Sequence, residues 1–195
     1  MSPTVEFLYD YASPYAFLAS ETLSRRLPGI PILYKPIYLR GLDTFSKGMP
    51  FVPAKLQYMG KDLSRIAKRE GVPHKLPSNF PVNGVYACRG DLWVQKNAPK
   101  KLQDYHRALF RAAWAENKNI SDKSAVAQLA GELGIDALAF AAGIDEEPLK
   151  EQLKAQTADA AKRGVFGVPT FFVGNEMFWG HDRMDYVLEA ARAAG

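Results

Sequence analysis

The chain has 195 residues, of which 47% are hydrophobic and 24% charged, and its formal net charge is +4. This material suffices for one core, and basic residues spread without a dense arm argue against nucleic-acid binding. A single cysteine, Cys88, excludes an intramolecular disulfide, and we find neither a signal peptide nor a run of membrane-spanning length. We therefore expect a soluble protein of the reducing cytoplasm.

The first forty residues predict a strand, a helix and a second strand. Residues 5–9 are apolar and rich in aromatic side chains, as is typical of a strand. Ser13 followed by Pro14 is a typical helix start, with the serine as N-cap and the proline in the first turn. The helix ends before Gly29, and residues 32–35 form the next strand. This βαβ unit predicts two parallel strands.

The rest of the chain is mostly helical until strand character returns near its end. Helices are expected near residues 56–67, 85–96, 101–117, 122–133, 136–141 and 148–163, with a loop over 41–53 and an irregular proline-rich passage over 73–81. Residues 170–173 and 176–179 predict a hairpin, because Gly174 and Asn175 form a tight turn between them. A last helix is expected to begin near Asp182.

The element order is thus βαβ, a long helical block, then αββα. Without the helical block, this order is that of the thioredoxin-like core. We therefore predict an α/β protein with a thioredoxin-like fold and a large inserted all-helical subdomain. The thioredoxin-like domain is assigned to residues 1–40 and 155–195, and the inserted subdomain to residues 41–154.

The helix start at Ser13-Pro14-Tyr15-Ala16 lies where thioredoxin-like proteins carry a C-x-x-C motif. There, the helix N-terminus lowers the pKa of a thiol. Both cysteine positions are lost in this chain, so a dithiol–disulfide cycle is not possible. A helix N-terminus with the Ser13 hydroxyl suits a thiolate that a ligand brings. The alternative is that Ser13 is only an N-cap.

The stretch Val168-Pro169-Thr170 leads into the predicted strand at residues 170–173. In the thioredoxin fold, a proline just before this strand is cis and faces the active-site helix. The backbone of the preceding residue can then pair with a bound peptide such as glutathione. A plain loop proline is the alternative.

Trp179 to Arg183 lie where the hairpin meets the final helix. Asp182 is a natural N-cap, and it could also receive a ligand ammonium such as the γ-glutamyl amine of glutathione. Arg183 could pair with a carboxylate. His181 suits a general base, although an ordinary surface histidine is the commoner case.

Three stretches, residues 7–15, 165–170 and 177–183, carry a family resemblance. The chain resembles the 2-hydroxychromene-2-carboxylate isomerases and, through them, the kappa-class glutathione transferases. Length and element order agree along nearly the whole chain. The terminal motifs are specific, whereas the helical middle matches mainly by pattern.

The resemblance implies that Ser13 is the catalytic residue, which bonds the sulfur of glutathione and holds it as a thiolate. Val168, beside Pro169, would pair with the cysteinyl backbone, and Lys55 would lie near a carboxylate of glutathione or substrate. The implied glutathione site comprises Ser13, Pro14, Tyr15, Lys55, Val168, Pro169, His181, Asp182 and Arg183. Weaker candidates for an aromatic substrate wall are Tyr11, Tyr86 and Trp179.

The resemblance further implies glutathione as the cofactor, no metal, a small aromatic carboxylate as substrate, and a homodimer. The family reaction converts 2-hydroxychromene-2-carboxylate to trans-o-hydroxybenzylidenepyruvate in aromatic catabolism, such as naphthalene degradation. Two positions depart from the family pattern. Gly48-Met49-Pro50 stands where an asparagine often occurs before Pro53, and His181 stands where asparagine or serine is frequent.

Three other functions stay open. A kappa-like transferase or peroxidase would use the same glutathione site. A protein disulfide oxidoreductase is disfavoured because C-x-x-C is missing, and a thioredoxin-like module without activity is the third. Cys88 lies within a predicted helix, far from any helix start, and is expected to be a small core residue.

Overall fold

The computed structural model describes residues 4–48 and 50–195 and is built around one mixed sheet. Its four strands lie in the order β2-β1-β3-β4. Strand β1 (Val5–Tyr9) pairs in parallel with β2 (Ile32–Pro36). It pairs antiparallel with β3 (Thr170–Val173), which in turn pairs antiparallel with β4 (Glu176–Trp179). The predicted βαβ unit and the predicted hairpin are both confirmed.

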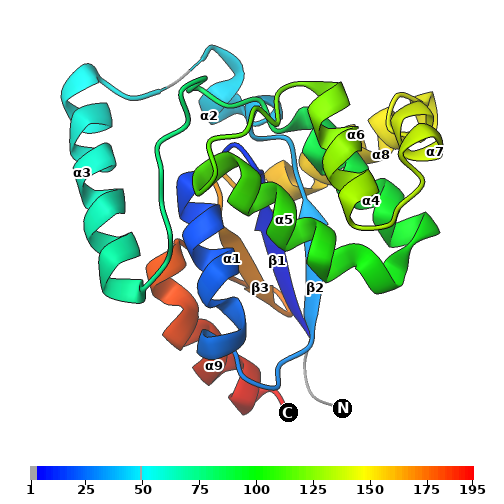
Figure 1. Cartoon of the computed structure of the whole chain (residues 1–195). Coiled ribbons are helices and arrows are strands. Elements are labelled where there is room, and N and C mark those ends of the chain that lie inside the picture. The colour runs from blue at the N-terminus through cyan, green and yellow to red at the C-terminus, as the bar shows by residue number, and fades with distance from the viewer. Residues whose placement is uncertain (1–3, 49) are drawn as a thin grey trace.

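Helices surround the sheet, and α1 (Pro14–Arg26) lies directly against it in front of β1 and β3 (Figure 1). The other helices are α2 (Asp43–Ser46), α3 (Pro53–Glu70), α4 (Val85–Asn97), α5 (Leu102–Trp114), α6 (Lys123–Glu132), α7 (Ala137–Gly143), α8 (Glu147–Lys162) and α9 (Met184–Ala193), with 3₁₀ turns η1 (Leu39–Gly41), η2 (Pro99–Lys101) and η3 (His181–Arg183). The expected loop over residues 41–53 therefore contains the short helix α2. The predicted domain boundary at residues 154/155 falls inside α8, and the domain division stays a prediction.

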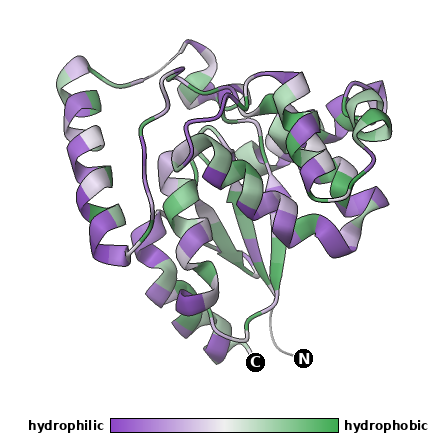
Figure 2. Cartoon of the chain, viewed as in Figure 1, coloured by the Kyte–Doolittle hydropathy of each residue, from purple (hydrophilic) through white to green (hydrophobic). Residues whose placement is uncertain are grey.

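Strand β1 is central and almost continuously buried, because helices cover the sheet on both sides. Apolar faces of the surrounding helices turn towards it and their polar faces turn outwards (Figure 2). One hydrophobic core runs through the sheet and the helices between β2 and β3. Within it, buried Trp114 of α5 donates its indole hydrogen to Tyr11 O at 2.8 Å. Helix α5 thus supports the loop that follows β1.

The loop between β1 and α1 is fixed by the buried carboxylate of Asp10. Its Oδ1 accepts from Ala12 N at 2.9 Å, and its Oδ2 accepts from Leu39 N at 2.7 Å. Gly84 lies so close that a Cβ there would be 2.0 Å from Asp10 Oδ1. Burial raises the pKa of Asp10. These contacts hold the turn in which Ser13 N donates to Asp10 O, and so place Ser13 at the start of α1.

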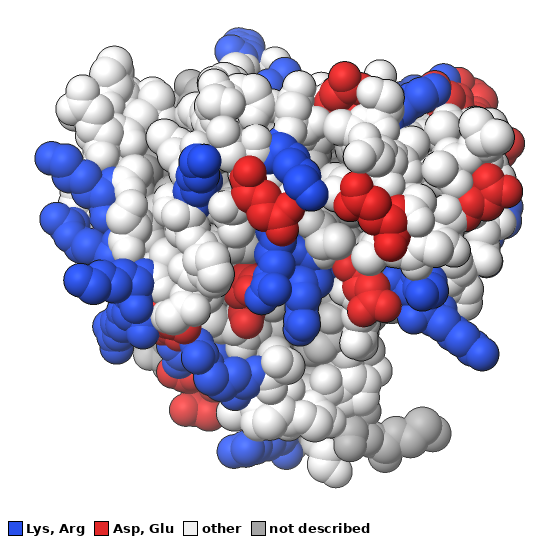
Figure 3. Space-filling view, viewed as in Figure 1, with Lys and Arg blue, Asp and Glu red and all other residues white. Residues whose placement is uncertain are grey.

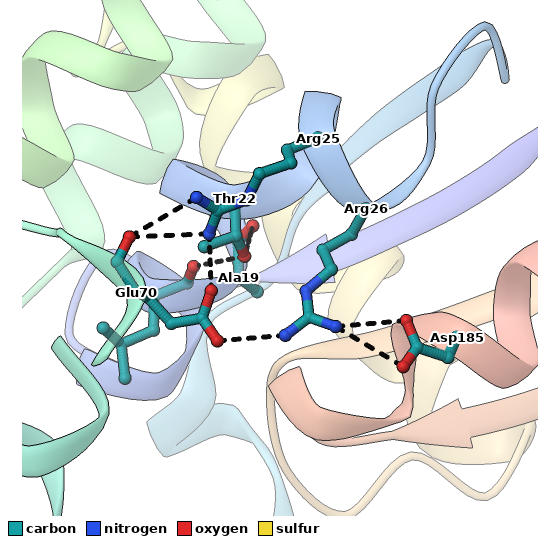
Figure 4. A network of polar contacts seen from close by, with 7 residues as sticks. Ala19, Thr22, Arg25, Arg26, Glu70 and Asp185 are labelled. Carbon is teal, nitrogen blue, oxygen red and sulfur yellow. Dashed lines mark hydrogen bonds and ion pairs between the residues drawn. The ribbon is translucent and has the colours of Figure 1, made fainter.

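Helix α3 is held mainly at its C-terminal end. Glu70 accepts from Arg25 and, at 3.0 Å, from Arg26, and Arg26 also pairs with Asp185 of α9 (Figure 4). The N-terminal half of α3 is largely exposed. Lys and Arg side chains gather along this side of the molecule (Figure 3). The arginine network thus joins the ends of α1, α3 and α9.

Cys88 is a core residue, as predicted. Its side chain is fully buried in α4, with Sγ 3.7 Å from Asp10 Oδ1. Burial raises the pKa of this thiol well above its usual range. A thiol held neutral in this way is a poor nucleophile.

In the part of the chain that the structure describes, no helix combines the length and apolar character needed to cross a bilayer. Met49, in the departure noted before Pro53, lies outside the described residues.

Candidate thiol-binding site

Ser13 is the N-cap of α1, and its side chain is turned towards the loop before β3. Its Oγ accepts from Ala16 N at 3.2 Å and donates to Val168 O at 3.2 Å. Pro14 has no amide hydrogen, and Phe17 N bonds to Ser13 O at 3.0 Å. Within the described residues, this leaves the amide of Tyr15 as the donor of the first turn without an assigned acceptor. Ser13 is therefore an N-cap, as one of the two interpretations of the sequence held. The Tyr15 amide beside it is still available to a ligand.

The Val168–Pro169 peptide bond is cis, as predicted, and lies against the start of α1. Pro169 O accepts from Gly180 N at 2.9 Å, and Thr170 Oγ1 donates to Gly167 O at 2.7 Å. The Val168 carbonyl receives the Ser13 hydroxyl, and its amide has no assigned acceptor in the described part of the chain. A peptide ligand that paired with this residue would meet a free amide.

Tyr15 and His181 bring α1 together with the segment after β4. Their rings stack with centroids 5.4 Å apart and an angle of 23° between the planes. Burial lowers the pKa of His181, so its imidazole is neutral at pH 7. Burial also raises the pKa of Tyr15, as do the nearby acidic groups Asp62 and Asp182. Ser13, Tyr15, Val168 and His181 therefore belong to one cluster.

Asp182 and Arg183 pair with each other rather than pointing separately at a ligand. Arg183 Nη1 lies 2.6 Å from Asp182 Oδ2, and both side chains are exposed. The prediction that Asp182 is an N-cap is wrong, because the 3₁₀ turn η3 precedes α9 and neither helix start has a side-chain cap. A ligand ammonium or carboxylate would have to exchange with this surface pair, which costs little.

Trp179 forms an exposed aromatic wall beside the loop that carries Val168. Its ring packs on Phe166 with centroids 4.9 Å apart, and the two side chains are 51% and 45% exposed. A Cβ at Gly167 would approach Trp179 Nε1 to 3.1 Å, so the Trp179 ring packs closely over this glycine. Two adjacent exposed rings suit an aromatic ligand.

Three predicted residues lie apart from this cluster. Tyr11 is fully buried, and its hydroxyl donates to Asp91 Oδ2 at 2.6 Å, so its ring belongs to the core and not to a substrate wall. Tyr86 is partly buried beside Arg89. Lys55 is exposed, with Nζ 4.4 Å from the centroid of the Phe51 ring. The described contacts of Tyr86 and Lys55 do not join them to Ser13.

Sequence reasoning missed Phe166 and two residues of α3. Phe166 could have been found as an apolar residue in a glycine-flanked loop. Tyr58 and Asp62 of α3 lie near enough to Tyr15 to raise its pKa. Tyr58 donates to Asp62 Oδ1 at 3.4 Å and is 58% exposed. No local signal marks these two, because their relation to Tyr15 depends on how α3 returns past α1.

The sequence over residues 4–192 matches the family described as DSBA-like thioredoxin domain. The chain belongs to this family. It is also 32% identical over 193 residues to a 2-hydroxychromene-2-carboxylate isomerase of Pseudomonas putida, covering 96% of this chain and 93% of that protein. This DSBA-like protein is therefore a relative of those isomerases, as the resemblance in its terminal motifs indicated.

Two further similarities agree with this. The DSBA-like chain is 29% identical to glutathione S-transferase kappa 1 of Rattus norvegicus, covering 93% of this chain and 87% of that protein. A solved structure of a 2-hydroxychromene-2-carboxylate isomerase superposes with a TM-score of 0.84 at 31% identity, covering 98% of this chain and 95% of that chain. The thioredoxin-like fold with a helical insertion is thus shown.

Proposed function

We propose that this protein is a glutathione-dependent isomerase that converts 2-hydroxychromene-2-carboxylate-type substrates to trans-o-hydroxybenzylidenepyruvate. One observation carries the proposal. Ser13 at the start of α1, Val168 before cis Pro169, and His181 stacked on Tyr15 meet at one place in a relative of such isomerases. The chain's single cysteine is buried elsewhere with a raised pKa, which supports a thiol supplied by a ligand.

The residues present fit a thiol-bearing peptide. The Tyr15 amide and the positive end of the α1 dipole favour an anion, and the Ser13 hydroxyl is a second donor. The Val168 amide suits the peptide backbone, and Asp182 and Arg183 offer a carboxylate and a guanidinium to its charged ends. Bound glutathione would supply a thiolate nucleophile that adds to a conjugated carbon and leaves after bond rotation, without net redox change.

The chain's own residues would hold glutathione and orient the substrate. Ser13 would transfer its hydrogen bond from Val168 O to the anionic sulfur, and neutral His181 would keep Tyr15 in place by stacking. Trp179 and Phe166 would cover the apolar body of the substrate. Lys55 and Tyr86 are retained as proposed contacts that a movement of α3 or α4 would have to bring nearer. A homodimer, a cytoplasmic location and a role in naphthalene catabolism also stay predictions.

The kappa-class relatives favour a second candidate, a glutathione transferase or peroxidase that uses the same site. Product analysis separates the two. The purified protein is incubated with 2-hydroxychromene-2-carboxylate and glutathione, and the mixture is resolved by chromatography. Rearranged substrate with glutathione recovered intact supports the isomerase. A stable conjugate, or oxidised glutathione in a parallel incubation to which a hydroperoxide is added as oxidant, supports the second candidate.

Calorimetric titration with glutathione tests the premise that both candidates share. Binding that Ser13→Ala weakens is the expected result. If no heat of binding is detected at millimolar glutathione, both candidates fail and a binding module without this ligand remains.

A further inference from the structure

A cavity of about 300 Å³ lies behind the C-terminal half of α1, between this helix, the start of β2 and the first turns of α5. Its volume is at the lower end of the range of small-molecule sites. The residues of α1 that line it begin at Ser20, seven positions after Ser13, which corresponds to about 10 Å along a helix. The cavity is therefore separate from the thiol-binding site.

The floor of the cavity is polar and firmly held. His106 is 3% exposed, and its Nε2 lies 2.8 Å from Ser20 Oγ. Its Nδ1 lies 3.5 Å from the hydroxyl of Tyr11, which donates to buried Asp91. This is not a catalytic triad, because Nδ1 is 3.8 Å from Asp91 Oδ2, beyond hydrogen-bond distance, and that oxygen already accepts from Tyr11. The arrangement instead fixes Ser20 as a hydrogen-bonding group at the cavity wall.

The lining of the cavity mixes polar and apolar side chains, and its rim carries a cation. Ile32 of β2 and Ile30 of the loop before it supply the accessible apolar surface, whereas Leu23 of α1 and Leu27, which follows α1, are only 5% and 2% exposed. Arg107 of α5 lies at the rim and is exposed. Arg111, one turn further along α5, is matched by Glu21 at 2.7 Å. Arg107 has no carboxylate within 4.0 Å among the residues that the structure describes. Its guanidinium thus remains available for an anion from outside.

We propose that this cavity binds a small apolar molecule that carries one carboxylate. The carboxylate pairs with Arg107, and the apolar body rests against Ile30 and Ile32. Burial of the apolar body supplies affinity, and the guanidinium fork supplies the preference for a carboxylate over a neutral analogue.

Benzoate is the probe, with benzyl alcohol as its uncharged counterpart. Both are titrated into the ¹⁵N-labelled full chain with saturating glutathione, and amide shifts are followed by NMR. We expect benzoate to shift Ser20, Ser24, Gln103 and His106 in one saturable transition, and benzyl alcohol to bind at least about fivefold more weakly. Arg107→Gln should weaken benzoate at least about fivefold.

Lys101→Gln is the matched control, because it removes the same charge just before α5 at an exposed position that does not line the cavity. It should bind benzoate like the unmodified protein, and an unchanged spectrum before titration shows that each variant is folded. The proposal is overturned if benzoate shifts centre on Ser13, Val168 and His181, if none saturate, or if Arg107→Gln binds as tightly as the unmodified protein. None of these outcomes depends on whether the protein isomerises a substrate.

Discussion

Ser13 Oγ and Val168 O lie 3.2 Å apart, although 155 positions separate them in the sequence. This bond fixes the start of α1 to the loop before β3. At 3.2 Å it is long for an O–H···O bond, which is usually 2.5–3.0 Å. The hydroxyl can therefore exchange the carbonyl for a stronger, anionic acceptor.

Ser13→Ala should raise the pKa of the thiol of bound glutathione and lower kcat/KM, because one donor to the sulfur is lost. Loss of the cap should also lower the free energy of unfolding by about 1 kcal/mol. Thiolate absorbance titrated against pH measures the first effect. Ser13→Thr keeps the hydroxyl and should titrate like the unmodified protein. An unchanged titration in Ser13→Ala would reduce Ser13 to its capping role.

Gly84→Ala should destabilise the fold, because its Cβ would lie 2.0 Å from Asp10 Oδ1 and 3.0 Å from Ala12 N. Overpacking of this kind costs about 1–3 kcal/mol, and it should displace the loop that carries Ser13. Gly60→Ala is the control, since a Cβ at this position of α3 meets nothing within 4 Å. That change should stabilise the protein by about 0.5–1 kcal/mol. Urea unfolding of Gly84→Ala and Gly60→Ala measures both changes in stability. Equal unfolding midpoints for the two variants would contradict the prediction.

His106→Gln should be less destabilising at low pH than at high pH. Burial lowers the pKa of His106, so below about pH 6.5 the unfolded chain binds a proton that the folded protein excludes. The stability contributed by neutral His106 is thus present above this range and is lost as the pH falls. The unfolding free energies of the unmodified protein and of His106→Gln, measured from about pH 8 to pH 5, should approach each other as the pH falls. A constant difference would mean that His106 titrates alike in both states.

Cys88 should resist Ellman's reagent in the native protein and react at once in denaturant. Its thiol is fully buried, and its raised pKa leaves little thiolate at neutral pH. The rate of absorbance change measures this, with urea-unfolded protein as reference. Native labelling as fast as in the unfolded reference would place the thiol at the surface.

The parts of the molecule that local sequence signals determine were predictable, and the parts that depend on distant partners were not. Ser13-Pro14 carries its own helix start, and the apolar run of β1 reads directly as a strand. Tyr11 lies within the motif that carries the resemblance, yet its ring turns inward because Asp91 accepts its hydroxyl from 80 positions away.

Asp182 and Phe166 likewise take positions that the local sequence does not predict. Asp182 has the residue type of an N-cap, but the extra turn η3 places it outside that role. Phe166 reaches Trp179 only after the hairpin has folded back.

The support that α4 and α5 give to the loop after β1 has a consequence for any attempt to shorten this protein. Excision of residues 41–154 would remove Asp91 and Trp114, which bond to Tyr9, Tyr11 and the backbone between β1 and α1. Each buried group stranded in this way costs about 1–3 kcal/mol, and a typical domain has only about 5–15 kcal/mol to lose. The sheet and α1 are therefore not expected to fold by themselves once these helices are removed.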